Sequence, residues 1–297
     1  MPLEIKVEKN LREQIPYPDV TFPFCVWTDV YNLFLDHTVN CHWHYDFEYG
    51  YVVSGIIDYY INDTCIKLRK GDCVFVNSNM LHMSMQSKGC NDAEMFTVTF
   101  PASLLTSSIN STVYTKILRP VIDNRIEGFI LASNSIAGQE MGNLLTALPA
   151  MKPSDFGYEL ICLSCVCQLW LLTLRNIMEA NGALLLHTGS IHNAERAKEI
   201  LSYIHAHYHE KITVEDIASH VSISRSECFR CFKRFMNKKP VAYINEYRLL
   251  RAAKLLRETE MSIVAVYTEC GFENASYFGK LFKQTYGMTP LQYRKVR

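Results

Sequence analysis

A change in the period of the apolar residues near Pro101 is the feature that most limits how this chain can fold. Between residues 22 and 100, short runs rich in Val, Ile, Tyr and Phe recur about every ten residues, which is typical of an antiparallel sandwich or barrel. Turn signals separate these runs, at Asn62-Asp63 and Gly71-Asp72. Residues 22–100 are therefore expected to form an antiparallel sandwich or barrel.

After Pro101 no further strand run is convincing, and the apolar residues take on a helical period. Helices are expected at about 112–122, 138–148 and 155–180. The last of them carries a wide apolar stripe, formed by Leu160, Leu163, Val166, Cys167, Trp170, Leu171, Leu174 and Ile177. A stripe of this width outside a barrel needs a partner, which is either the barrel itself or a second chain.

Length and composition allow two domains and give no sign of export. A chain of 297 residues is long enough for two separate cores. No apolar run reaches the roughly 18 residues of a membrane span, and the charged N-terminus MPLEIKVEKNLREQ lacks the apolar core of a signal peptide. We therefore expect a cytoplasmic protein that makes no contact with a membrane.

The eleven cysteines are an odd number and are scattered along the chain. Two clusters, Cys162-Cys165-Cys167 and Cys228-Cys231, lack a second pair of ligands at zinc-finger spacing. Reduced thiols that fill apolar sites are therefore the expected role, and the cysteines are not expected to bind metal.

The net charge of zero hides an uneven distribution of charge. From Ser190 onward there are 18 Lys and Arg against 11 Asp and Glu, whereas the first 189 residues carry the remaining 12 against 19. The first part of the chain is thus acidic by about 7 charges and the second part basic by about 7. Such an asymmetry points to an anionic partner, such as nucleic acid, for the basic end.

The basic end contains two similar segments about fifty residues apart. Residues 212–235 and 261–287 each read as a short helix, a tight turn and a second helix, which is a helix-turn-helix unit. The turns are expected near Ser222 and Gly271, with Ser224 and Asn274 as helix caps. The two units align on their Phe-Lys pairs, at Phe232-Lys233 and Phe282-Lys283.

The second helix of each unit has one apolar and one polar face, and the polar face can meet DNA. Phe229 or Tyr277 offers apolar contact to a thymine methyl group, and Arg230 can bond bidentately to guanine. The alternatives are that Phe229 is buried in the core of its unit and that Arg230 is a surface or phosphate-facing charge. The polar faces are expected to present Arg225, Ser226, Phe229, Arg230 and Lys233 in the first unit, and Ser276, Tyr277, Lys280 and Lys283 in the second.

Between the units, PVAYINEYRLLRAAKLLRET starts with Pro240 and predicts a helix of about 18 residues, or about 27 Å at 1.5 Å per residue. A stiff connector of this length can hold two recognition helices near the ~34 Å repeat of the major groove on one face of DNA. The alternative is a helical bundle whose basic residues only form a solvated face.

Three stretches of this region resemble the C-terminal signature of the AraC/XylS family of transcriptional regulators. They are Y-I-x-x-Y-R-L-x-x-A-x-x-L-L at 243–256, G-F-x-x-x-S-Y-F-x-K-x-F-K at 271–283 and G-M-T-P-x-x-Y-R at 287–294. The resemblance covers about residues 195–297. Tyr267 and Ala275 depart from the family, since a small residue is usual at the first position and Ala275 cannot donate a hydrogen bond. By position, the resemblance implies base reading by Ser226, Phe229, Arg230, Ala275, Ser276, Tyr277 and Lys280.

The stretch HWHYDFEYGYVVSG holds His42, His44 and Glu48, and the stretch GDCVFVNSNMLH ends at His82. On alternate strand positions the first two histidines face one side, and the other two residues can approach from neighbouring strands. The two stretches resemble the two short motifs of the cupin superfamily of small β-barrels. They depart from the metal-binding cupins at Asn77 and Asn79, where Pro and Gly are usual.

The use of this His/Glu set stays open at this point. Three imidazoles and a carboxylate can ligate a divalent metal such as Fe, Mn, Ni or Zn. They can equally hydrogen-bond a small effector in a pocket, and the nearby aromatic residues fit a carbohydrate. A purely structural role is the third option. The residues concerned, for effector or metal, are His42, His44, Glu48 and His82.

Together these patterns predict an α+β protein: a cupin-like effector-sensing barrel at 1–105, a helical dimerisation segment at 106–181, a linker at 182–193 and an AraC-type double helix-turn-helix DNA-binding domain at 194–297. We expect a homodimeric transcriptional regulator and not an enzyme. A bound effector is expected to change DNA affinity or contact with RNA polymerase. The rival hypotheses are a cupin metalloenzyme with an accessory nucleic-acid module, and an adaptor that binds only protein.

Overall fold

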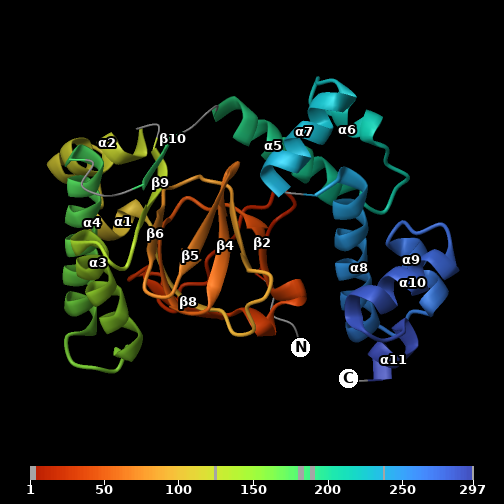
Figure 1. The fold of residues 1–297 in the computed structure, drawn as a ribbon, viewed down its shortest axis with the longest axis horizontal. Coiled ribbons are helices and arrows are strands. Elements are labelled where there is room, and N and C mark those ends of the chain that lie inside the picture. Colours follow the sequence, from red (N-terminus) through yellow and green to blue (C-terminus); the bar gives the residue numbers. More distant parts are fainter. Residues whose placement is uncertain (1–4, 124–125, 180–183, 188–190, 237, 296–297) are drawn as a thin grey trace. The chain divides into compact units, whose positions relative to one another are not determined.

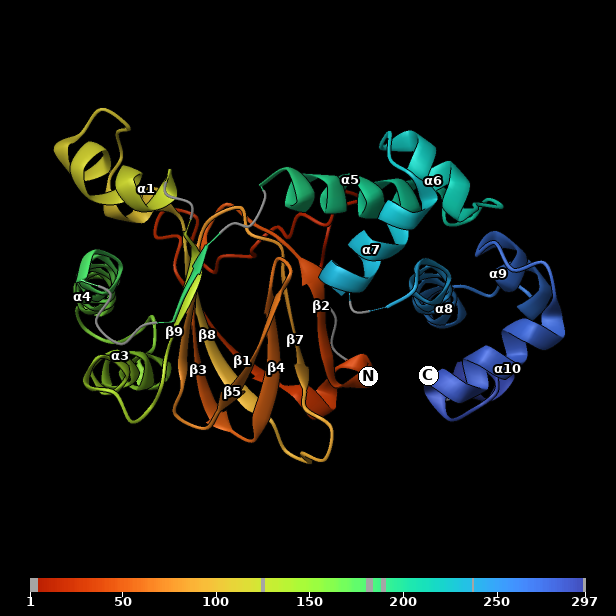
Figure 2. The same cartoon turned by 45° about the horizontal axis from the view of Figure 1, so that its top comes forward.

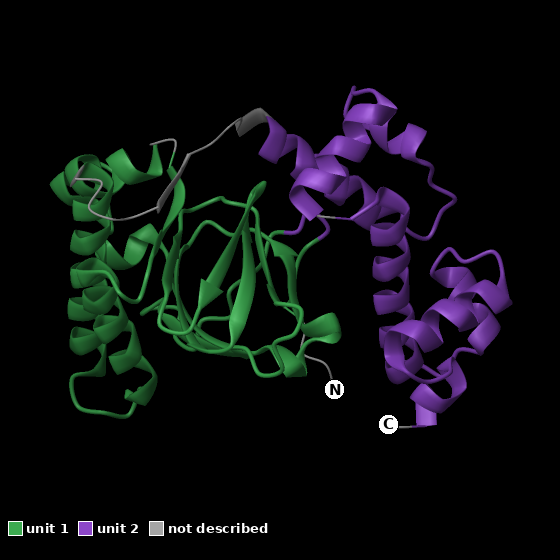
Figure 3. Ribbon diagram, in the orientation of Figure 1, with its two compact units in different colours: residues 1–8, 12–191 green, residues 9–11, 192–297 purple. Residues whose placement is uncertain are grey.

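The chain forms two compact units, which Figure 3 shows in separate colours. The structure is a computed structural model and describes residues 5–123, 126–179, 184–187, 191–236 and 238–295. The first unit comprises residues 1–8 and 12–191, and the second comprises residues 9–11 and 192–297. The boundary at residue 191 lies inside the segment that the sequence predicts as a linker.

The described strands of the first unit form two antiparallel sheets (Figure 1). One sheet has the order β1-β8-β3-β6-β9-β10, and the other has the order β2-β7-β4-β5. The regular strand pattern up to residue 100 is confirmed, and Asn62 and Gly71 make their turns at φ of 49° and 87°. The strands are β1 (Cys25–Val30), β2 (Thr38–His42), β3 (Phe47–Ser54), β4 (Ile56–Ile61), β5 (Thr64–Arg69), β6 (Cys73–Val76), β7 (His82–Gln86), β8 (Glu94–Phe100), β9 (Ile126–Leu131) and β10 (Leu184–His187).

Two of these strands lie where the sequence predicts none, so that prediction is wrong. β9 lies within the segment expected to be helical, and β10 lies within the expected linker at 182–193. β9 is buried on both faces, and its apolar run therefore lacks the alternation that marks a half-buried strand. Gly128 lets β9 approach β6, because a Cβ there would lie 2.2 Å from the carbonyl oxygen of Phe75.

Two helices cover the outer face of the six-stranded sheet. α3 (Ile136–Ala147) and α4 (Tyr158–Glu179) lie side by side against it (Figure 2). The rings of Phe47 and Trp170 lie 4.4 Å apart between centroids, and the hydroxyls of Tyr49 and Thr173 are hydrogen-bonded at 2.6 Å. The three helices predicted here are confirmed. The shorter elements are α1 (Ala102–Leu105), α2 (Arg119–Ile122) and the single turns at Tyr31–Leu33, Leu35–His37, Tyr114–Leu118 and Leu148–Ala150.

The buried face of α4 differs from the predicted stripe. Leu160, Cys167 and Leu171 belong to that stripe but are exposed. In the described part of the chain, α4 is the one helix that is long and apolar enough to cross a membrane by length and composition, contrary to the expectation that no such run exists. Because 44% of that apolar window is buried within the protein, packing accounts for much of its hydropathy. The face against the sheet is formed by Cys162, Cys165, Val166, Leu169, Trp170 and Leu172.

The side chains of β3 alternate between two buried environments. Phe47 and Tyr49 pack in the core beneath α4, whereas Val52 packs in a second core between the two sheets. Glu48 follows the inward alternation and is buried. The sheet therefore has an aromatic outer face and an inner face that carries a carboxylate.

The second unit is helical throughout its described part. Its turns lie at Ser222 and Gly271, with φ of 55° and 78°, as the sequence predicts. The predicted caps are also confirmed, because Ser224 Oγ accepts from the Glu227 N–H and Asn274 Oδ1 accepts from the Tyr277 N–H. The helices are α5 (Ile191–His207), α6 (Val214–His220), α7 (Arg225–Met236), α8 (Pro240–Glu258), α9 (Ile263–Glu269), α10 (Ala275–Tyr286) and α11 (Pro290–Lys295), of which α6–α7 and α9–α10 are the two helix-turn-helix pairs.

The turn at Gly271 yields a stability prediction. We expect Gly271→Ala to lower the free energy of unfolding by about 1–3 kcal/mol, because φ there is positive and a Cβ would lie 2.5 Å from the Tyr208 carbonyl oxygen. The matched control is Gly279→Ala in α10, where a Cβ meets nothing within 4 Å and helix propensity favours Ala. Urea denaturation followed by circular dichroism measures both. Equal stability of the two variants would contradict the prediction.

Candidate functional site

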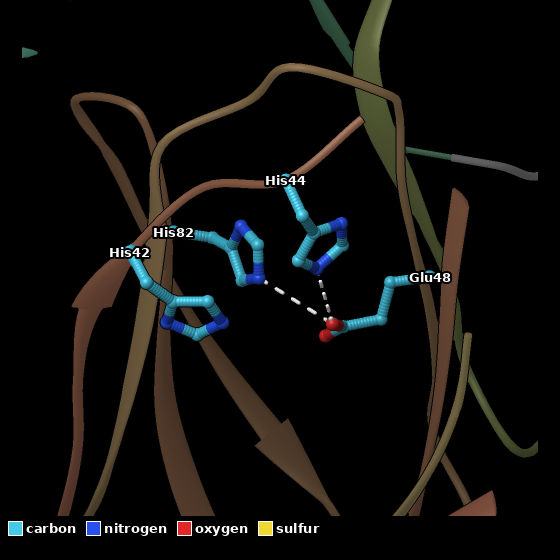
Figure 4. A group of neighbouring side chains, drawn as sticks. All are labelled: His42, His44, Glu48 and His82. Carbon is cyan, nitrogen blue, oxygen red and sulfur yellow. Dashed lines mark hydrogen bonds and ion pairs between the residues drawn. The ribbon is translucent and has the colours of Figure 1, made fainter. Parts of the chain in front are cut away.

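Four polar side chains meet inside the first unit (Figure 4). His42 ends β2, Glu48 lies on β3 and His82 begins β7, while His44 lies in the connection that follows β2. All four are buried, and their ligand-capable atoms lie within 4.8 Å of one another. The structure therefore brings together the four residues that the sequence singles out.

Backbone carbonyls orient all three imidazoles in the same way. Nδ1 of His42 lies 2.7 Å from the Asn40 carbonyl oxygen. The corresponding distances are 3.1 Å from His44 to Asp46 and 2.9 Å from His82 to Met80. Because a carbonyl only accepts, each Nδ1 is a donor, and in the neutral ring Nε2 carries a lone pair. The Nε2 atoms thus face the centre of the cluster, as acceptors in neutral rings and as donors to Glu48 in protonated rings.

Glu48 is the charged centre of this cluster. Its Oε1 accepts a bond from the Tyr59 hydroxyl at 2.6 Å, and its Oε2 lies 3.2 Å from His44 Nε2 and 3.4 Å from His82 Nε2. Burial opposes ionisation, but the facing imidazoles of His82 and His44 outweigh it and hold the pKa of Glu48 well below its usual range. His82 Nε2 is buried and makes no well-aligned hydrogen bond. A proton or another cation between these atoms would relieve the contact.

The carboxyl oxygens of Glu48 face a cavity of about 280 Å³ in the same unit. Its walls combine apolar side chains with a row of hydroxyl and carboxyl groups. The inner faces of both sheets and residues 5, 6 and 13–16 of the N-terminal segment contribute to the lining. The polar lining residues are Lys6, Glu13, Gln14, Thr28, Asp29, His42, Glu48, Tyr59, His82, Ser84, Thr97 and Thr99.

Two acidic residues of this cavity are missing from the sequence-based prediction. Glu13 Oε2 lies 3.5 Å from His42 Nε2, and Asp29 accepts a bond from Thr97 at 3.1 Å. Burial raises the pKa of each carboxyl to about 7, and the charge of Glu48 adds to the effect. Glu13 belongs to no periodic pattern, and Asp29 is a single acidic residue in β1 without a motif around it. Only the folded barrel brings them near the histidines.

The two asparagines that depart from the cupin motif shape the same region. Asn77 donates from Nδ2 to the carbonyls of Val121 and Ile126, at 2.9 and 3.0 Å. Asn79 has φ of 67°, the left-handed region that Asn tolerates better than most residues, and its N–H donates to the His44 carbonyl at 2.7 Å. The departures therefore preserve the turn that leads into His82.

The predicted DNA-contacting residues form exposed faces on α7 and α10. Phe229 is only half-buried, with the guanidinium of Arg225 5.8 Å from the centre of its ring, so it lies at the edge of the core. The inner faces are formed by Cys228, Cys231, Phe232 and Phe235 on α7 and by Phe278 and Phe282 on α10, with Leu281 partly buried. The exposed residues are Arg225, Ser226, Arg230 and Lys233 on α7, and Ala275, Ser276, Tyr277, Lys280 and Lys283 on α10.

Several of these exposed side chains have partners in the protein itself. Arg225 is paired with Glu215 at 3.0 Å, and Arg230 forms an ion pair with Glu227. Tyr277 accepts a hydrogen bond from Asn245 of α8 at 3.0 Å. Exposed ion pairs contribute little to stability, so exchange of a carboxylate for a DNA phosphate or base costs little. The faces are thus available to an anionic partner.

The cysteines are free thiols in the structure. Cys162, Cys165, Cys228 and Cys231 are buried and Cys167 is exposed. Burial raises the pKa of Cys228 to about 11 and that of Cys231 to about 12. The buried thiols act as apolar fillers of the core, in line with the sequence.

Comparison with known proteins identifies both domains. A model described as a helix-turn-helix domain matches residues 217–296, and a cupin domain model matches residues 36–99. The chain therefore holds a helix-turn-helix domain and a cupin domain, and its homologues are AraC-family transcriptional regulators. Its relatives are named as transcriptional regulators and not as enzymes.

Two relatives and one solved structure are similar to this chain over all or part of its length. The uncharacterized HTH-type transcriptional regulator YdeC of Bacillus subtilis is 29% identical over 295 residues, which cover 98% of both chains. The regulatory protein PocR of Salmonella typhimurium is 37% identical over 100 residues, which cover 34% of this chain and 33% of PocR. The structure of ToxT from Vibrio cholerae is 13% identical with a TM-score of 0.42, covering 92% of this chain and 98% of ToxT.

Proposed function

We propose that this regulator reads DNA with the exposed faces of α7 and α10 and senses a small effector in the cavity of its first unit. The observation that carries the proposal is the cavity itself, which is lined by His42, Glu48 and His82 of the buried cluster in a chain with an AraC-type DNA-binding domain. Such a chain combines a site that receives a signal, the cavity, with a site that acts on DNA, the exposed faces of α7 and α10. Because its target is DNA, we place it in the cytoplasm.

The DNA contacts follow from the chemistry of the two faces. Arg230 and Lys280 supply cationic donors on separate helices, and both side chains are exposed. Tyr277, held by Asn245, presents a ring to a thymine methyl group, and Ser276 presents a hydroxyl. Ala275 adds only apolar contact. The first turn of each helix leaves N–H groups that can bond phosphate oxygens.

The effector is assigned to His42, His44, Glu48 and His82 with the cavity around them. A ligand that binds one arrangement of the protein better than another shifts the population toward it. In this way the signal changes DNA affinity or the contact with RNA polymerase. A transcription assay with purified polymerase and the chain's own upstream region, with and without effector, distinguishes the two.

A divalent metal at the same four residues is the second candidate, and the donor set fits one. Ligands at about 2.1 Å on opposite sides of an ion lie about 4.2 Å apart, so the four donor atoms, all within 4.8 Å, need only a small contraction. The three Nδ1 groups already donate to backbone carbonyls. Carbonyls in this position commonly orient metal-ligating histidines by accepting a bond from the second ring nitrogen. A bound metal would supply a Lewis-acidic contact for an effector oxygen.

The outer face of α4 is proposed as the contact between two copies of the chain. Leu160, Leu171 and Met178 are 74%, 59% and 81% exposed on one helix, although all three are apolar. A homodimer would cover them and would provide two DNA-binding domains for two half-sites.

Measurement of DNA affinity over a range of salt concentrations tests the proposed DNA-contacting faces of α7 and α10. With a fragment of the chain's own upstream region, we expect Arg230→Ala and Lys280→Ala each to weaken specific binding by about 1–3 kcal/mol. Lys88→Ala, an exposed lysine of the first unit, is the control and should leave affinity unchanged. If both recognition variants bind as tightly as the parent, the adaptor that binds only protein is favoured.

Metal analysis of protein purified without chelator tests the second candidate. We expect about one divalent ion per chain, and His44→Ala should lose it because one ligand is removed. His209→Ala, an exposed histidine of the second unit, should retain it. Protein that carries no metal and takes up none during titration with Zn²⁺ would eliminate the metal and the metalloenzyme with it.

Sedimentation velocity tests the dimer. Leu171→Asp should convert the dimer to monomers, because a charge is costly in an apolar interface. Ile109→Asp, which changes an equally apolar and 70% exposed residue outside α4, should leave the dimer intact. A parent protein that is monomeric at micromolar concentration would refute this interface.

A further inference from the structure

The cavity of the first unit contains more carboxyl groups than the imidazoles of the histidine cluster pair with. Three carboxyl groups line it, those of Glu13, Asp29 and Glu48. Apart from the imidazoles, Lys6 is the one basic side chain in the described lining, and it is exposed. Glu48 and Glu13 each have an imidazole beside them. Asp29 is therefore the carboxyl without a basic neighbour.

The surroundings of Asp29 show this directly. Its Oδ2 accepts a bond from the Thr97 hydroxyl, and no Lys, Arg or His among the described residues lies within 4 Å of it. Burial raises the pKa of Asp29, because no counter-ion stabilises its charged form. A ligand that brings a positive charge would stabilise the ionised form.

A row of polar groups connects Asp29 with the histidine cluster. Thr99 lies opposite Glu48 in the pairing of β3 with β8. Thr97 precedes it by two residues on β8 and lies opposite Trp27 of β1. The Thr99 hydroxyl is buried, lines the cavity and has no hydrogen-bond partner among the described residues. His82 Nε2 is buried there too, with a 3.4 Å contact to Glu48 Oε2 but no well-aligned hydrogen bond. Buried polar atoms without partners are costly and are usually satisfied by a ligand or by water. They indicate where a second polar group of a ligand would bind.

We propose that the effector is a small organic cation, whose ammonium group is held by Asp29 and whose hydroxyl group is held by Thr99 and His82. The inference rests on the proposed sensor function and names the ligand class for its cavity. Trp27 and Tyr59 also line the cavity, and aromatic faces attract organic cations. An acidic effector is disfavoured, because its carboxylate would face Glu13, Asp29 and Glu48, each of which repels it when ionised.

Two matched sets of probes test the proposal by varying charge at nearly constant shape. One set is 4-amino-1-butanol, 1,4-butanediol and 4-hydroxybutyrate, and the other is glucosamine, glucose and glucuronate. Thermal unfolding of the full chain is followed at millimolar probe, constant ionic strength and neutral pH, with a chelator present. We expect the cationic member of at least one set to raise Tm and the neutral and acidic members of that set to have little effect.

Asp29→Asn provides the matched variant. It removes the charge and keeps the size, and we expect it to weaken the binding of the cationic probe by about tenfold or more. Asp92→Asn, the same change at an exposed position of the same unit, should not alter binding. Should Asp29→Asn fail to fold, the comparison of probes on the parent protein still decides.

The outcomes separate this proposal from the one on which it rests. Equal or larger Tm shifts with the neutral or acidic members, or no shift with any probe, overturn the cationic effector. Binding of the cation to Asp29→Asn with unchanged affinity overturns the assigned residue. DNA binding is measured on the same samples, and its absence in the parent protein overturns the regulator itself, whichever probe binds.

Discussion

The first unit depends on the burial of β3 on both of its faces. Because side chains alternate along a strand, the aromatic face that packs under α4 obliges the next residue, Glu48, to point into the barrel. An ionised carboxylate in such a place is costly unless it is paired. The Tyr59 hydroxyl and the imidazoles of His44 and His82 provide that pairing. The polar cluster is thus coupled to the hydrophobic core through a single strand.

The same coupling gives the cavity two different ends. At one end the charge of Glu48 is compensated by groups that the protein itself supplies. At the other end Asp29 is held only by a hydroxyl. A cavity with one compensated and one uncompensated charge selects ligands by their charge, since solvent screens interactions less among buried groups than at the surface. The site is therefore suited to recognition, and α4 connects its supporting sheet with the exposed face proposed for dimerisation.

In the second unit, the recognition faces are kept exposed by the packing of the opposite faces. Phe278 and Phe282 anchor α10, and Phe232 and Phe235 anchor α7, which leaves the intervening residues on the surface. Acidic neighbours hold Arg225 and Arg230 without burying them. In the proposed complex with DNA, such arginines exchange a carboxylate for a phosphate.

Local patterns were sufficient to predict much of this protein. Period-two alternation, turn residues such as Gly71 and caps such as Asn274 act within a few residues, so the barrel strands and both helix-turn-helix units could be read from the sequence. The sequence does not predict β9, because a strand buried on both faces has no alternation and resembles part of a buried helix. The sequence also leaves open how the apolar stripe of α4 divides between the sheet and the exposed face, since a stripe does not say which of its edges meets the sheet.

By itself, the sequence determined the two domains, the polar faces of α7 and α10, and the four residues of the His/Glu cluster. Only the tertiary structure decided that Glu13, Asp29 and Thr99 share one cavity with that cluster. These residues come from the N-terminal segment, β1 and β8, which are far apart in the chain. Strand pairing brings them together, and a single carboxyl on a single strand carries no sign of its future neighbours. The charge of the cavity is for this reason a property of the fold.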